Sequence, residues 1–149
     1  MDYVIRQVVS NDRQAWEDLY HSYLSFYESE PIASSTELLW ERLSASPAII
    51  QSFVAELNGE VVGLVHFHFQ LSTWTHTFHC YLEDLYVAEE HRGKGIARAL
   101  IDSVKASALD KKCSELFWIT KESNKTAQKL YDKLATKSDF IRYEIMLED

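Results

Sequence analysis

The chain has 149 residues, of which 46% are hydrophobic and 26% are charged. These fractions are typical of a soluble globular protein and exclude an intrinsically disordered chain. The length predicts one domain, residues 1–149, with a core of its own. Acidic residues outnumber basic ones by 23 to 15, so the formal net charge is −8. Because nucleic-acid binding requires a basic face that neutralises phosphates, this charge argues against a nucleic-acid partner.

Apolar stretches in the chain are shorter than the roughly 18 to 20 residues that a membrane span requires. Residues 1–6 also lack the basic and apolar regions of a secretion signal. We therefore expect a cytoplasmic protein without a membrane contact. The only cysteines, Cys80 and Cys113, form no CxxC motif. His66 and His68 share one predicted strand face and suggest a metal site with His76 or His79, but no nearby carboxylate or cysteine spacing supports it. We predict no metal site.

The N-terminal half predicts a strand, two helices and a β-hairpin. β-branched residues indicate the strands, and apolar residues at three- and four-residue spacing indicate the helices. Asn58-Gly59 separates two strand-like runs and is typical of a type I′ turn, which requires two positive φ angles. In chain order we expect a strand at 3–9, a helix at about 13–27, a shorter helix from the cap at 34–36 to before Pro47, and strands at 49–57 and 60–69.

The C-terminal half predicts alternating strands and helices. The strand that begins at about residue 78 ends before a glycine-rich turn, and the last strand is predicted from alternating apolar residues. In chain order we expect a strand at 78–87, a helix from the turn to about 109, a strand at 115–120, a helix at 124–134 and a strand at 140–147. The predicted order is therefore βααβββαβαβ.

The turn Arg92-Gly93-Lys94-Gly95-Ile96-Ala97 is a candidate anion site, because it joins a predicted strand to the start of a helix. Free backbone N–H groups and the positive end of a helix favour an anion there, and glycines let a phosphate approach the backbone. The P-loop pattern is absent, and Arg98 occupies the place of the third glycine of the dinucleotide pattern. A glycine-rich turn with solvated charges is the alternative interpretation.

Three linked motifs resemble the GNAT superfamily of acetyl-CoA-dependent N-acetyltransferases. They are the strand at 81–87, the R-x-x-G-x-A hexad at 92–97, and Asn124-x-x-Ala127-x-x-Leu130-Tyr131. The family fold implied is a single α+β domain with a mixed, mostly antiparallel sheet flanked by helices, which matches the predicted order. The segment Leu82-Glu83-Asp84 is most similar to polyamine acetyltransferases and to histone and polyamine acetyltransferases. The family's Gly-Phe after the tyrosine is replaced here by residues 134–137.

This resemblance implies acetyl-CoA as the co-substrate. It places the pyrophosphate on the backbone amides of the hexad and the pantetheine arm along the preceding strand, where that strand diverges from its neighbour. The residues implied to hold the coenzyme are Leu85, Tyr86, Val87, Arg92, Gly93, Lys94, Gly95, Ile96, Ala97, Arg98, Asn124 and Ala127.

The reaction requires a base, because an aliphatic amine with a pKa near 10.4 is protonated at pH 7. The resemblance implies Glu83 for this role, and strand alternation predicts that Asp84 lies on the opposite face. It also places Tyr131 near the thioester sulfur, where a phenol can protonate the leaving thiolate. The backbone N–H of Val87 is a candidate donor to the developing oxyanion. Glu83 as an exposed carboxylate and Tyr131 as a packing residue are the alternatives.

We expect transfer of an acetyl group to a primary amine of a cationic small molecule, such as a polyamine, by direct attack in a ternary complex. Tyr27, Glu28 and Glu83 are candidate substrate-binding residues, because aromatic rings and carboxylates attract ammonium groups. The alternatives are a protein lysine, an aminoglycoside or an amino acid as acceptor, or a noncatalytic acyl-CoA-binding module. An exposed final strand, together with relatives that pair, favours a homodimer.

Overall fold

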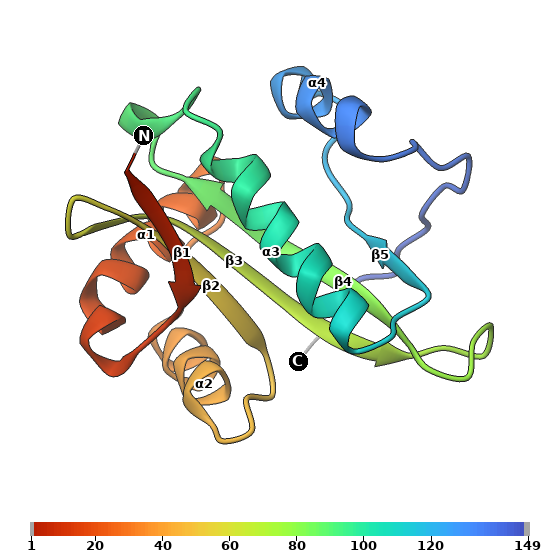
Figure 1. The fold of residues 1–149 in the computed structure, drawn as a ribbon, viewed down its shortest axis with the longest axis horizontal. Coiled ribbons are helices and arrows are strands. Elements are labelled where there is room, and N and C mark those ends of the chain that lie inside the picture. The colour runs from red at the N-terminus through yellow and green to blue at the C-terminus, as the bar shows by residue number, and fades with distance from the viewer. Residues whose placement is uncertain (1, 148–149) are drawn as a thin grey trace. The chain divides into compact units, whose positions relative to one another are not determined.

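A computed structural model describes residues 2–147 (Figure 1). The chain divides into two compact units, Met1–Ile119 and Thr120–Asp149, which we describe separately. The second contains the helix α4 (Lys125–Leu134). The first contains, in chain order, β1 (Tyr3–Gln7), the short 3₁₀ helix η1 (Ser10–Asp12), α1 (Arg13–Phe26), α2 (Ala33–Ser44), β2 (Gln51–Leu57), β3 (Glu60–Leu71), β4 (Phe78–Val87), the 3₁₀ helix η2 (Glu89–His91), α3 (Ile96–Asp110) and β5 (Glu115–Phe117).

The five strands form one sheet in the order β1-β2-β3-β4-β5. The pairs are antiparallel except for β4 and β5, which are parallel. Asn58 and Gly59 join β2 to β3 with φ angles of 52° and 81°, the two positive values that a type I′ turn requires. The predicted hairpin and the α+β class with a mixed, mostly antiparallel sheet are confirmed.

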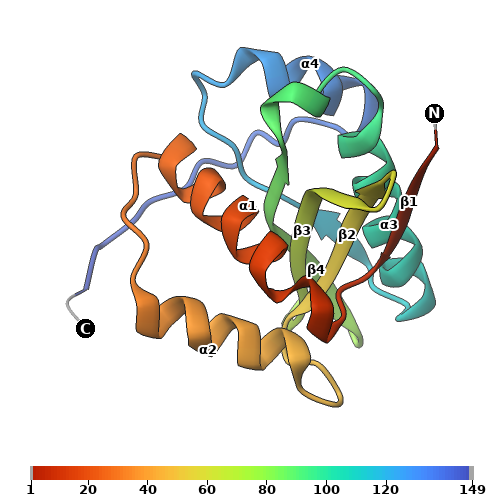
Figure 2. The same ribbon diagram turned by 90° about the vertical axis from the view of Figure 1, so that its left-hand side faces the viewer.

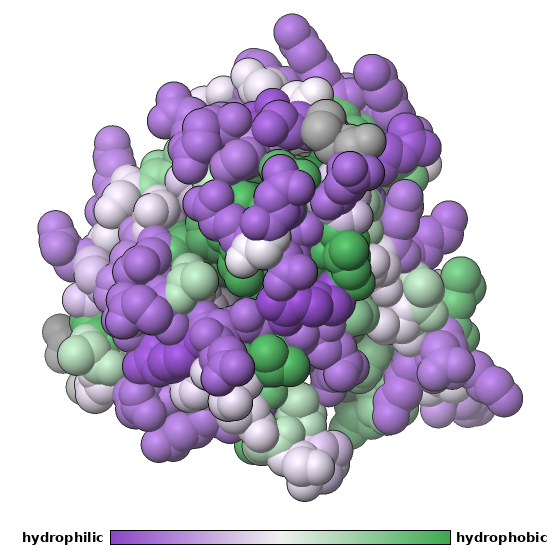
Figure 3. Space-filling model, turned by 60° about the vertical axis from the view of Figure 1, so that its left-hand side comes forward, coloured by the Kyte–Doolittle hydropathy of each residue, from purple (hydrophilic) through white to green (hydrophobic). Residues whose placement is uncertain are grey.

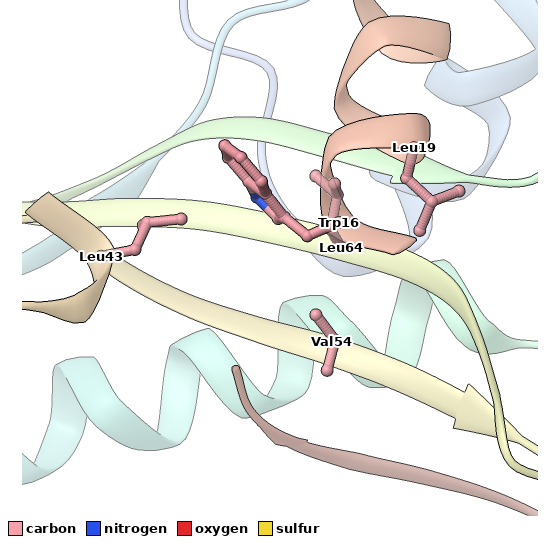
Figure 4. Close-up of a cluster of buried hydrophobic side chains, with 5 residues drawn as sticks. All are labelled: Trp16, Leu19, Leu43, Val54 and Leu64. Atoms are coloured by element: carbon pink, nitrogen blue, oxygen red, sulfur yellow. The ribbon is translucent and has the colours of Figure 1, made fainter. Parts of the chain in front are cut away.

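Helices cover both faces of this sheet (Figures 1 and 2). Helices α1 and α2 lie on one face, where Trp16, Leu19, Leu43, Val54 and Leu64 form a buried cluster (Figure 4). Helix α3 lies on the other face and packs closely on β3 at Gly63, where a Cβ atom would be 3.3 Å from both Ile96 and Leu100. The two faces of the sheet therefore have different partners, and α1 is the helix that faces the middle of β3 and β4.

The predicted strand at 140–147 is absent from the structure, where these residues form neither helix nor strand. The alternating sequence provides an apolar face, but a strand also needs a neighbouring strand edge that pairs with its backbone, and local pattern does not report on that edge. The large apolar side chains of this segment are 76–89% exposed: Phe140, Ile141, Tyr143, Ile145, Met146 and Leu147.

Hydrophilic side chains cover much of the face shown in Figure 3, and the apolar residues there form small patches. Among residues 2–147, no helix combines the length and the apolar character that crossing a membrane requires.

Candidate functional site

The glycine-rich turn between β4 and α3 has the backbone geometry of an anion site. Gly93 and Gly95 have φ angles of 78° and 82°, in the left-handed region that favours glycine. Gly95 is the N-cap of α3, so the turn ends where the first N–H groups of a 15-residue helix have no acceptor within the helix. These groups and the helix dipole favour a negatively charged ligand at this end of α3.

The side chain of Arg92 packs against the protein. Its Nε donates a hydrogen bond of 3.0 Å to the carbonyl oxygen of Val87, and its guanidinium carbon lies 5.3 Å from the ring centre of Tyr86 and 5.9 Å from that of Phe26. The Lys94 ammonium lies 3.3 Å from Nδ1 of His91. The turn therefore offers an anion mainly backbone amides, with two cationic side chains beside them.

β4 has an open edge next to this turn. Among residues 2–147, β4 and β5 pair only where His79–Tyr81 face Glu115–Phe117. The part of β4 from Leu82 to Val87 pairs with β3 on one side, and β5 does not continue along the other. The pairing of the two strands therefore ends at Tyr81 and Phe117, and the divergence that the family resemblance implied stays a prediction.

The direction of the β4 backbone groups follows from one hydrogen bond. Ala88 N–H donates to the carbonyl oxygen of Val62 on the β3 side at 2.8 Å. Because successive residues of a strand direct their backbone groups to opposite sides, the groups of Tyr86 point toward β3 and those of Leu85 and Val87 point toward the open edge. Leu85 and Val87 thus offer backbone contacts to an extended ligand, whereas the backbone of Tyr86 does not, and its ring packs against Tyr23 and Arg92.

A β-bulge in β4 changes the direction of one carboxylate. His66 of β3 faces Asp84, but the next residue, Phe67, faces Leu82, so Glu83 is an extra residue in β4. A bulge of this kind interrupts the alternation of side chains along a strand. Glu83 and Asp84 therefore need not alternate between the two faces of the sheet.

Both carboxylates lie on the α1 face of the sheet. Asp84 Oδ2 is 2.9 Å from Nδ1 of His66, and Glu83 Oε1 is 3.2 Å from Nε2 of His68. His66 and His68 are two residues apart on β3, which pairs regularly with β2 at this point, so they share one face. The prediction of opposite faces was wrong, because alternation cannot anticipate a bulge. Glu83 is 50% exposed and Asp84 is 17% exposed.

Tyrosines of α1 surround these carboxylates. Burial raises the pKa of Tyr20 to about 12, with smaller contributions from the negative charges of Asp84 and Glu83. Burial also holds the pKa of Tyr23 well above its usual value, as do the charge of Asp84 and a hydrogen bond to it. The rings of Tyr20 and Tyr23 are stacked, with centres 6.1 Å apart. Two phenols and two carboxylates therefore meet at one place, a combination that suits a cationic ligand.

At the end of α1, the structure places the two other predicted substrate residues. Tyr27 follows the last residue of α1, and its ring centre lies 5.1 Å from that of Tyr23, which joins it to the aromatic row. Glu28 is exposed and has a φ angle of 56°, so the chain turns sharply there. The structure shows no contact between Glu28 and the Glu83–Asp84 pair among the described residues.

In the second unit, α4 carries the remaining predicted residues. Asn124 is the N-cap of α4, and its Oδ1 accepts a hydrogen bond of 3.4 Å from the backbone N–H of Ala127. Tyr131 is half-buried and lies on the same helix. The roles of Asn124, Ala127 and Tyr131 toward the coenzyme stay predictions.

The sequence interpretation missed Asp84, His66 and Trp16, which form a chain of hydrogen bonds at this site. A histidine within an otherwise apolar strand was the one signal that could have identified it. Among residues 2–147, no group of three or more histidine, cysteine or acidic residues is placed to hold a metal ion. A surface hollow of about 400 Å³ lies elsewhere, between the end of α2 and the start of β2, and none of the predicted site residues line it.

A model of the acetyltransferase (GNAT) family matches residues 16–135. The chain is 30% identical over 152 aligned residues to the D-amino-acid N-acetyltransferase HPA3 of Saccharomyces cerevisiae, covering 95% of this chain and 89% of the relative. It is 43% identical to the thialysine N-epsilon-acetyltransferase of Bos taurus, over 77 residues that cover 52% of this chain and 45% of that protein.

Solved structures have the same fold. A ribosomal-protein-alanine N-acetyltransferase from Brucella melitensis biovar Abortus matches with a TM-score of 0.80 and 27% identity, covering 98% of this chain and all of that one. The aminoglycoside acetyltransferase AAC(6')-Iy, in complex with a bisubstrate analogue, matches with a TM-score of 0.82 and 20% identity, covering 99% of both chains. At 20% identity, the match to the aminoglycoside acetyltransferase shows a shared fold only.

Proposed function

Because the chain belongs to the GNAT acetyltransferase family and is an N-acetyltransferase, we propose that it acetylates a primary amine of a cationic small molecule, such as a polyamine. Members of the family use acetyl-CoA as the donor. The observation that carries the proposal is the position of Glu83 and Asp84 on the α1 face, beside Tyr20 and Tyr23. Carboxylates and aromatic rings together stabilise an ammonium group.

On the donor side, the residues present fit acetyl-CoA. The turn at 92–97 offers backbone N–H groups to the pyrophosphate, and the open edge of β4 offers the backbone groups of Leu85 and Val87 to the pantetheine arm. When bound, acetyl-CoA supplies the acetyl group as a thioester. Arg98 adjoins the turn, and we keep Asn124 and Ala127 as coenzyme contacts on the family resemblance.

On the acceptor side, the amine must lose a proton before it attacks. Glu83 accepts this proton, either directly or through a water molecule; its half-exposed position gives the proton a path to solvent. The N–H of Val87, which points to the open edge, donates to the oxygen on which negative charge develops. Tyr131 donates its phenolic proton to the departing sulfur, a role that rests on the family resemblance.

Direct attack in a ternary complex is favoured over an acyl-cysteine route. Burial raises the pKa of the Cys80 thiol to about 12, so little thiolate is present at neutral pH. Burial also raises the pKa of the Cys113 thiol. A thiol nucleophile requires the thiolate form, and neither cysteine provides it.

The test is release of free thiol from acetyl-CoA with a panel of polyamines, aminoglycosides, amino acids and a lysine peptide, together with a titration of acetyl-CoA binding. We expect turnover with polyamines and a kcat for Tyr131→Phe that is about 100-fold to 10,000-fold lower, with acetyl-CoA affinity unchanged. Coenzyme binding without turnover on any amine would favour a noncatalytic acyl-CoA-binding module. Turnover on the peptide alone would move the acceptor class to protein lysines. We further propose a homodimer, to be tested by light scattering; this proposal rests on the family resemblance alone, because the predicted final strand is absent.

A further inference from the structure

Trp16, His66 and Asp84 form a chain of hydrogen bonds with a fixed direction. The indole Nε1 of Trp16 donates to Nε2 of His66 at 2.9 Å, and Nδ1 of His66 lies 2.9 Å from Oδ2 of Asp84. An indole N–H can only donate, so Nε2 of His66 must be the nitrogen without a proton. The proton of the neutral imidazole is therefore on Nδ1, and His66 donates it to Asp84.

Only the Asp84 end of this chain reaches solvent. Trp16 is fully buried and His66 is 1% exposed, whereas the Asp84 side chain is 17% exposed. The hydroxyl of Tyr23 is also hydrogen-bonded to Asp84, and the raised pKa of Tyr23 keeps this hydroxyl protonated and able to donate. Asp84 is thus held by two donors from within the protein and is still accessible to a ligand from outside.

The direction of these hydrogen bonds determines the charge that Trp16, His66 and Asp84 carry together. A doubly protonated His66 would place an N–H on Nε2 directly against the N–H of Trp16, which is repulsive, and it would neutralise Asp84. With His66 neutral, the Trp16–His66–Asp84 group carries one negative charge, located at its accessible end. The other charged or titratable groups facing it are Tyr20, Tyr23 and Arg13 of α1, Glu83 of β4 and His68 of β3; the Arg13 guanidinium carbon lies 5.5 Å from the ring centre of Trp16. Arg13 is paired with Glu17 and Glu37 rather than with Asp84.

We propose that Asp84 binds the ammonium group of the acceptor amine, and that Trp16 and His66 are positioning residues that hold Asp84 in place and keep it charged. This proposal rests on the proposed function and divides the work of the two neighbouring carboxylates. Asp84, which the hydrogen bond from His66 holds in place, selects and orients the cation. Glu83, which is more exposed and is hydrogen-bonded to the partly exposed His68, accepts the proton.

The first test replaces Asp84 by asparagine, which keeps the shape and removes the charge. We expect the acceptor KM of Asp84→Asn to rise by at least about tenfold, because a hydrogen bond to a charged group is lost, while the KM for acetyl-CoA changes by less than about twofold. Calorimetric titration with spermidine should show the same loss of affinity. An unchanged acceptor KM and an unchanged spermidine affinity would overturn the proposal.

The second test addresses the positioning role through pH. Trp16→Phe keeps an aromatic ring but removes the indole N–H, so no donor then opposes an N–H on Nε2 of His66. We expect the ratio of the acceptor KM in this variant to that of the wild type to increase as the pH falls from about 8 to about 6. Trp40→Phe is the matched control. Trp40 packs on Trp16, with ring centres 5.0 Å apart, but it takes no part in the hydrogen bonds that join Trp16, His66 and Asp84. Its ratio should stay constant over the same range.

A third variant separates charge from packing. His66→Gln retains one acceptor and one donor but cannot be protonated, so adding Trp16→Phe to it should produce no pH-dependent rise. His66→Leu should raise the acceptor KM at every pH. A pH-dependent rise of the same size in the double variant Trp16→Phe/His66→Gln would show that His66 does not mediate the effect.

Nitrogen-15 NMR of His66 provides a readout that is independent of turnover. We expect a neutral imidazole with its proton on Nδ1 at pH 7, and a proton on Nε2 would overturn the proposal. If the wild type acetylates no amine, the proposed function fails. The NMR result and the spermidine titration of wild type and Asp84→Asn still decide the proposal for Asp84.

Discussion

Replacing Gly95 by alanine tests whether the turn before α3 is the donor site. Gly95 has a φ angle of 82°, and a Cβ atom there would have Tyr3 Oη at 3.6 Å as its one neighbour within 4 Å among the described residues, an ordinary contact. The cost to folding is therefore conformational, about 1–2 kcal/mol for a non-glycine residue in the left-handed region. For a chain of this size, this corresponds to a decrease in Tm of about 2–8 °C.

Gly59→Ala is the matched control. Gly59 has a φ angle of 81°, and its Cβ would meet no described atom within 4 Å, so the expected decrease in Tm is the same. Gly59 lies in the turn between β2 and β3, away from the turn at 92–97 in the sequence and on a different connection. The two variants thus differ in the predicted donor site but hardly in the strain they introduce.

Acetyl-CoA affinity should distinguish the two variants. If Gly95→Ala shifts the backbone N–H groups away from the pyrophosphate, the loss of one charge-assisted hydrogen bond, about 1.5–3 kcal/mol, raises the Kd about 10-fold to 150-fold. Calorimetric titration with acetyl-CoA measures this, and differential scanning calorimetry measures the Tm. Equal losses of Tm with an unchanged Kd in both variants would refute the assignment of the pyrophosphate to this turn.

Two further substitutions test the fold. The hydrogen bonds from Arg6 hold the pKa of Asp12 below its usual value, so the free energy of unfolding should decrease as the pH falls below about 4. Urea denaturation between pH 3 and 7 measures this decrease, which should be smaller for Asp12→Asn than for the wild type. A pH dependence identical to the wild type would contradict this role. Gly63→Ala would place a Cβ 3.3 Å from Ile96, Leu100 and the carbonyl oxygen of Tyr86. We expect the free energy of unfolding, measured by urea denaturation, to decrease by about 1–3 kcal/mol. No decrease would mean that α3 moves freely away from β3.

Local sequence signals predicted most elements and the turn at the donor side. Asn58-Gly59 indicated the hairpin because its two positive φ angles are a local requirement, and the helix after Gly95 followed from three- and four-residue spacing. Where a strand ends also depends on its neighbours, so β5 is confined to Glu115–Phe117 although strand-like sequence continues to Thr120.

The acceptor side was less predictable, because it depends on contacts between distant residues. The bulge at Glu83 is a relation between β3 and β4, and no pattern within either strand indicates the extra residue. His66 meets Trp16 across 50 positions of sequence and Asp84 across 18. The sequence drew attention to His66 only as a candidate metal ligand, and its actual partners became evident from the fold.

The short pairing of β5 with β4 has a consequence for solubility. From Leu82 to Val87, β4 has no strand partner along one side among residues 2–147, although it lies inside the strand order of the sheet, and of the Val87 backbone groups on that side the carbonyl is bonded to Arg92. Such an edge can recruit a strand of another chain, which is a common route to aggregation. A donor arm with amides of its own that lies along this edge would act as a substitute strand. Storage with coenzyme A should therefore slow aggregation and protect the amides of Leu85 and Val87 from hydrogen exchange.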